Sequence, residues 1–185
     1  VFPAERSLAL TASLFALLTL CLGVMLRSAQ TALFLDNFDP SWLPYHYAAV
    51  ALCMMGVSIF YAKISQGRTW RLDLACLFIA ALLLLGCRLA LLWVPSKALV
   101  FLIAVLALLV SQFSMLICFT SINISLDSRQ TKRILPLVGA GATLGSMLGG
   151  VLVAFVAGHW QNDALFAVAG LWLLVLAFLP LLLHR

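Results

Sequence analysis

Six long apolar segments, separated by short polar turns, dominate this chain. They cover about 7–34, 44–65, 72–94, 98–125, 134–157 and 164–183. Each is long enough to cross a bilayer as a helix, which takes about 20 predominantly apolar residues. Hydrophobic residues make up 65% of the chain and charged residues 9%, against about 45–50% and about 25% in an average soluble domain. Backbone in lipid must bond internally, so we expect an all-α integral membrane fold of six transmembrane helices surrounded by the lipid bilayer.

We expect the helices to form a single bundle over residues 1–185, because no segment is left for a separate soluble domain. The chain begins at Val1 rather than Met and stops at Arg185, directly after an apolar run. From this we expect a fragment of a longer polypeptide.

Basic residues are distributed unequally over the turns. Lys97 lies on one side, whereas the side with both chain ends holds Arg6, Lys63, Arg68, Arg71, Arg129, Lys132, Arg133 and Arg185. Lys and Arg accumulate in cytoplasmic turns, so we expect both termini in the cytoplasm, in a bacterial inner membrane. In a transporter, the turns Lys63–Arg71 and Arg129–Arg133 would flank the cytoplasmic gate.

Several functions are not expected from these residues. The formal net charge of +5 reflects membrane topology, so we expect no nucleic-acid partner. The three histidines, His46, His159 and His184, lack the spacing or acidic neighbours of a metal site. No nucleophile has an acid/base partner within plausible reach. We therefore expect neither an enzyme nor a metal or cofactor.

The first segment contains a charged residue, Arg27, in its outer half. A charge within the bilayer costs about 2.5–3.5 kcal/mol even on the lenient insertion scale. Arg27, Gln30 and Thr31 share one helix face, because they are three and four residues apart. They are candidate ligands for a small anionic solute. The alternative is that Arg27 extends to the outer interface and carries no function.

The fourth segment carries a second polar stripe, in which Gln112, Thr120 and Asn123 fall within one arc of a helix. Gln112 and Asn123 are candidates for hydrogen bonds to a solute in a central cavity. The alternative is hydrogen bonding to a neighbouring helix.

Small residues recur in the fifth segment, where Gly141, Gly145 and Gly149 follow one another every four residues and Ser146 lies in the adjacent row. Such a surface lets another helix approach closely, since packing drives helix association in lipid. It serves either as a static contact or as a sliding surface in a conformational cycle. We expect Pro136 near the start of this helix, where its missing N–H costs nothing.

The string Ile134–Gly150, preceded by a basic pair, resembles the corresponding helix of the ATP/ADP translocase-like family of the major facilitator superfamily. Weaker similarity covers Leu26–Leu35, Trp42–Tyr45 and Ser111–Phe113. The resemblance implies the N-terminal six-helix half of a twelve-helix transporter. It is closer to bacterial members of unassigned substrate than to the nucleotide translocases, which carry a Lys-Asp pair where this chain has Gln30-Thr31.

Two functions follow as expectations. The first is one half of a major-facilitator-type transporter for an anionic or phosphorylated solute, which works by alternating access with a second six-helix half or another membrane chain. The second is a transporter-derived bundle without transport activity, which acts as an anchor or partner-binding module. Sparse intramembrane charge and the missing Lys-Asp pair favour the second.

The predicted orientation can be tested by cysteine labelling. A cysteine introduced as Ser128→Cys, in a background without the native cysteines, should react with a membrane-impermeant reagent only after the cytoplasmic side is opened. A cysteine introduced as Ser96→Cys should react from the outside. Labelling of the position-128 cysteine from outside would contradict the orientation.

Overall fold

The computed structural model describes residues 6–64, 70–93, 96–159 and 164–177, and within these ranges the chain is all-helical. The helices, in chain order, are α1 (Arg6–Asn37), the short 3-10 helix η2 (Pro40–Trp42), α2 (Leu43–Ile64), α3 (Trp70–Trp93), α4 (Lys97–Ser125), α5 (Ser128–His159) and α6 (Ala164–Ala177). The predicted all-α class is confirmed. Part of the last predicted segment, residues 178–183, lies outside the described ranges.

Four helices in the described part of the chain, α1, α2, α4 and α5, are long and apolar enough to cross a membrane. The apolar stretches of α3 and α6 are shorter, at Leu72–Cys87 and Leu165–Ala177. By length and composition, the described residues therefore support four of the six predicted spans.

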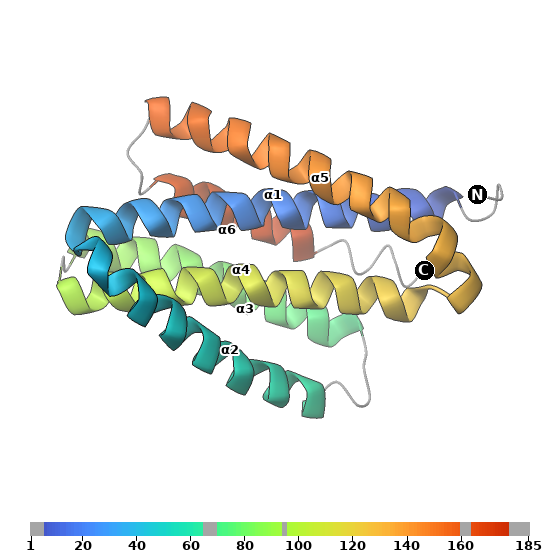
Figure 1. Cartoon of the computed structure of the whole chain (residues 1–185), viewed down its shortest axis with the longest axis horizontal. Coiled ribbons are helices and arrows are strands. Elements are labelled where there is room, and N and C mark those ends of the chain that lie inside the picture. The colour runs from blue at the N-terminus through green and yellow to red at the C-terminus, as the bar shows by residue number, and fades with distance from the viewer. Residues whose placement is uncertain (1–5, 65–69, 94–95, 160–163, 178–185) are drawn as a thin grey trace.

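Helix α1 lies at the centre of the bundle, in contact with α4, α5 and α6. Helix α3 packs against α6 and α4, and α2 packs mainly against α4. In Figure 1, α5 crosses α1 at an angle and α2 diverges from α4 towards its C-terminal end. The first helix is thus the one around which the others assemble.

The contact between α1 and α5 is made by the glycine row. A Cβ at Gly141 would collide with Ser13, and a Cβ at Gly145 with the backbone of Leu17. A Cβ at Gly149 would lie 2.8 Å from the carbonyl oxygen of Cys21. The Ser13 hydroxyl also donates a 3.1 Å hydrogen bond to the carbonyl of Leu137. Backbone therefore packs on backbone along three turns of α5.

Helix α5 begins earlier than the sequence predicts. The expected span starts at 134, whereas the helix starts at Ser128, so Pro136 lies inside it rather than near its start. The basic residues before the apolar run continue the helix, because Thr131 already bonds through its N–H to the carbonyl of Asp127 at 2.8 Å. Pro136 has no N–H to donate to the preceding turn.

Two further contacts hold the other helices in place. The indole N–H of Trp172 on α6 donates a 3.1 Å hydrogen bond to the carbonyl of Leu18 on α1. At the start of α4, the Ser96 hydroxyl caps the helix by accepting from the N–H of Leu99 at 3.2 Å. The latter is the ordinary role of serine at a helix N-cap.

The glycine contact predicts a position-specific response on α5. Gly145→Ala should lower the free energy of unfolding by about 1–3 kcal/mol, because its methyl group meets the Leu17 backbone. Gly150→Ala is the matched control, since nothing lies within 4 Å of a Cβ there, and it should be neutral or stabilise by about 0.5–1 kcal/mol. Unfolding in detergent measures both. Equal stability of the two variants would contradict the assigned contact.

Candidate functional site

A cleft of about 380 Å³ lies between α1, α2 and α4. Its polar lining residues are Arg27, Gln30 and Thr31 from α1, Tyr47 from α2 and Gln112 from α4. Val50, Ala51, Met54 and Leu108 complete the lining. The structure thus brings together four of the five residues that the sequence analysis selected for a solute.

Arg27 lies where two cavities meet. It lines the cleft and also a smaller pocket of about 90 Å³ between α1, α4 and α5, beside Ser111 and Ser146. Its side chain is exposed, and among the described residues no carboxylate forms an ion pair with it. The guanidinium therefore has N–H donors available to a ligand in the cleft.

Gln30 lines the cleft but is only 1% exposed. Its amide Nε2 donates a 2.7 Å hydrogen bond to the Thr31 hydroxyl, and its Oε1 lies 3.0 Å from Nε2 of His46. The sequence analysis expected Gln30 to bond a solute. In the structure its amide bonds instead to two neighbouring side chains.

His46 is the residue of this site that sequence reasoning missed. It is fully buried at the start of α2, where its ring stacks on Phe34 with centroids 4.9 Å apart. Phe101 of α4 meets the same ring edge-on at 5.8 Å. In the sequence, His46 is a lone histidine beside the start of a predicted helix. Its ring contacts depend on how α1, α2 and α4 pack together, and the residue pattern of one helix does not predict that packing.

Asn123 does not line the cleft. It is exposed, near the C-terminal end of α4, whereas Gln112 lies near its middle. A spacing of 11 residues returns to the same face of a helix but moves about 16 Å along its axis. The shared arc that grouped the two residues therefore does not bring them together.

The candidate gate residues lie at helix ends. Lys63 is exposed in the last turn of α2, and Arg129, Lys132 and Arg133 are exposed in the first turns of α5. Arg71 lies in the first turn of α3, and Arg68 falls outside the described residues.

The small residues predicted to pack against another helix differ in how deeply they are buried. Gly141, Gly145 and Gly149 are buried against α1, and Ser146 is half-buried. The Ser146 hydroxyl donates back to the carbonyl of Ala142 at 3.1 Å. This leaves the serine as part of the small pocket's wall beside Arg27.

A buried carboxylate, Asp73, also escaped the sequence analysis. It is fully buried in the first turn of α3. Its Oδ1 accepts a 2.9 Å hydrogen bond from the Tyr61 hydroxyl of α2, and its Oδ2 accepts one of the same length from Ser121 of α4. In the sequence, the signal for this buried group was an acidic residue between Leu72 and Leu74, at the second position of the predicted segment 72–94. Asp73, Tyr61 and Ser121, here called the Asp73 cluster, join α3, α2 and α4 near the helix ends that lie away from the cleft.

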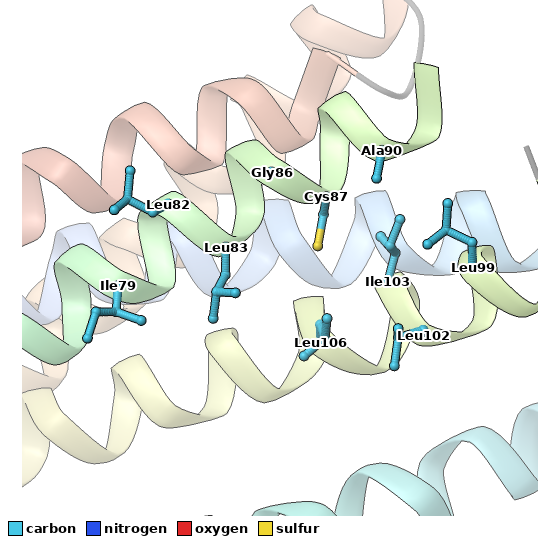
Figure 2. Close-up of a pocket in the computed structure, with 10 residues that line it drawn as sticks. All are labelled: Ile79, Leu82, Leu83, Gly86, Cys87, Ala90, Leu99, Leu102, Ile103 and Leu106. Carbon is cyan, nitrogen blue, oxygen red and sulfur yellow. The ribbon is translucent and has the colours of Figure 1, made fainter. Parts of the chain in front are cut away.

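Another cavity, of about 390 Å³, lies between α3 and α4 (Figure 2). Its walls are aliphatic apart from the sulfur of Cys87, with Ile79, Leu83 and Leu106 among the residues that point into it. It offers no strong hydrogen-bonding side chain. The polar chemistry of the described residues is therefore concentrated in the cleft beside Arg27 and in the Asp73 cluster.

Comparison with models of known protein families found no match, and searches of curated proteins and of solved structures found none either.

The Asp73 cluster predicts a stability effect that a surface tyrosine lacks. Tyr61→Phe should lower the free energy of unfolding by about 1–3 kcal/mol, because it removes a hydrogen-bond partner of the buried Asp73 carboxyl group. Tyr45→Phe, at a tyrosine of the same helix that is 69% exposed, should change stability by less than about 0.5 kcal/mol. Detergent unfolding compares the two, and an equal effect would contradict the role of the cluster.

Proposed function

We propose that this chain is one six-helix half of a membrane transporter for a small anionic solute, which works by alternating access. The observation that carries the proposal is the cleft between α1, α2 and α4. It gathers Arg27, Thr31, Tyr47 and Gln112 around one open space in a largely apolar bundle. Its volume of about 380 Å³ is in the usual range for small-molecule sites, about 300–1,000 Å³.

The energetics of a charge in lipid favour a ligand for Arg27. An intramembrane cation costs about 2.5–3.5 kcal/mol on the insertion scale, and the described residues supply it with no carboxylate. An anionic solute would offset that cost while it is bound. A charge that served only to reach the outer interface would need no polar neighbours on the facing helix, yet Gln112 of α4 lines the same cleft.

The unequal burial of the helices supports a second half. Helices α2 and α5 bury a much smaller share of their apolar stretches than α1 and α4 do. In transporters built from two repeats, the solute site lies near the bilayer midplane at the interface of the halves. A second six-helix half, or another membrane chain, that covers α2 and α5 would close the cleft from the outside.

The major-facilitator-type organisation, the resemblance to the ATP/ADP translocase-like family and the bacterial inner-membrane location belong to this proposal. In it, both termini are cytoplasmic and the basic ends of α2, α3 and α5 flank the inner gate. A bundle without transport activity would be favoured by a sealed interior. The open, polar cleft supports transport instead.

Arg27→Ala provides the test. In the natural full-length polypeptide reconstituted into liposomes, uptake of radiolabelled inorganic phosphate or pyrophosphate should fall at least about tenfold, because a charged hydrogen bond contributes about 1.5–3 kcal/mol. Arg27→Lys should keep part of the activity. Arg6→Ala, which removes an exposed arginine at the other end of α1, should leave uptake unchanged. Uptake that is insensitive to Arg27→Ala, or no uptake of either anion by the unmodified protein, would contradict the proposal.

A further inference from the structure

Thr31 differs from the other threonines that the structure describes. Each of the others donates its hydroxyl proton to a backbone carbonyl of the preceding turn; they are Thr11, Thr19, Thr120, Thr131 and Thr143. Thr31 instead accepts a hydrogen bond from the amide Nε2 of Gln30 at 2.7 Å. Among the described residues its own proton meets no acceptor, and its side chain lines the cleft.

Thr31 is the last member of a chain of three side chains that starts at His46. Nε2 of His46 lies 3.0 Å from Oε1 of Gln30, and Gln30 bonds Thr31. His46 and Gln30 are 0% and 1% exposed, so neither side chain can exchange its partner for water. The ring of His46 is held by its stack on Phe34, with an angle of 13° between the ring planes.

The unpartnered nitrogen of His46 determines the direction of this chain. Nδ1 of His46 is buried and has no hydrogen-bond partner among the described residues. Buried N–H groups without an acceptor are rarer than buried acceptors without a donor. This favours the neutral tautomer that carries its proton on Nε2 and leaves Nδ1 as a bare lone pair.

With the proton on Nε2, every bond in the chain points towards the cleft. Nε2–H of His46 donates to Oε1 of Gln30, and the amide N–H of Gln30 donates to Thr31. The Thr31 hydroxyl, having accepted that bond, has its proton left to donate. The opposite tautomer would reverse the amide, engage the Thr31 proton with Gln30 and present an acceptor to the cleft.

We propose that His46 is a positioning residue that holds Thr31 as a hydrogen-bond donor beside Arg27, so that the cleft selects a ligand with free oxyanion oxygens. The proposal rests on the proposed function and names the ligand chemistry of the same site. Arg27 and Thr31 are four residues apart on α1 and therefore neighbours on one face. One provides charge and the other a directed O–H, a pair that suits a phosphate or carboxylate and repels a cation.

The test measures inorganic phosphate affinity of the full-length protein in nanodiscs of zwitterionic lipid. His46→Phe keeps a ring on Phe34 but loses the N–H, and Thr31→Val loses the hydroxyl at constant shape. Each should weaken binding about tenfold, the effect of one hydrogen bond to a charged ligand. Thr143→Val, at an exposed threonine bonded to its own helix, should have no effect.

Non-additivity separates positioning from a merely structural role. Because His46 acts through Thr31, the double variant His46→Phe/Thr31→Val should bind phosphate no more weakly than Thr31→Val alone. His46→Gln, which returns an N–H donor near the same place, should restore binding to within about threefold of the unmodified protein. Additive losses, or no rescue by His46→Gln, would overturn the proposal.

A spectroscopic measurement keeps the proposal testable if His46→Phe does not fold. In protein with ¹⁵N-labelled histidine, the signal of His46, identified by its loss in His46→Gln, should show the Nε2–H tautomer. The Nδ1–H tautomer would overturn the proposal. Phosphate binding that depends on Arg27 but not on His46 or Thr31 would overturn it and leave the proposed function standing, and absence of phosphate binding would overturn both.

The oxyanion has two sources, a soluble solute or a phospholipid headgroup. Phosphate titrations repeated in nanodiscs with phosphatidylglycerol distinguish them. Competition by the anionic lipid assigns the site to a headgroup, and its absence assigns the site to a soluble anion. Either result retains the directed donor at Thr31 if the variants behave as above.

Discussion

The close approach of α5 to α1 is the contact on which the arrangement of the helices depends. Without side chains at Gly141, Gly145 and Gly149, the two backbones meet, and α1 can also contact α4 and α6. A helix held on three sides leaves only one face for a cleft. That face carries Arg27 and Thr31, so the packing of α5 determines where the polar residues of α1 end up. In lipid, where apolar burial adds little to helix association, such backbone packing supplies much of the stabilisation.

Hydroxyl groups in an apolar bundle must find partners nearby, and most of them do so within their own helix. Thr19, Ser114 and Thr120, for example, each donate to a carbonyl four residues earlier. A hydroxyl that bonds to another side chain instead is informative, because a carbonyl of its own helix could have satisfied it. In the described part of the chain the clearest are at Thr31, which bonds Gln30, and at Ser121, which bonds Asp73. Both lie where α2 meets the rest of the bundle.

The sequence predicts elements within one helix well and contacts between helices poorly. Apolar length and turn residues predicted α4 within one residue at its start, and the spacing of Arg27 and Thr31 predicted their shared face. The start of α5 was misplaced because its first turns are basic rather than apolar. His46 and Asp73 were missed because their partners lie on other helices. The position of Asn123 was misjudged because helical periodicity gives direction but not depth.

Helix α2 packs on α4 through a small apolar cluster of Val50, Val105 and Leu108, and it makes polar contacts at its two ends. Near its start His46 meets Gln30 of α1, and near its end Tyr61 meets Asp73 of α3. An apolar cavity of about 250 Å³ lies beside Val57, where α2 faces α3 and α4. A few hydrogen bonds contribute about 0.5–3 kcal/mol each, less than a continuous packed face. The helix that closes one side of the cleft is therefore also the least buried of the four long helices, which is the property that the proposed alternating access would require.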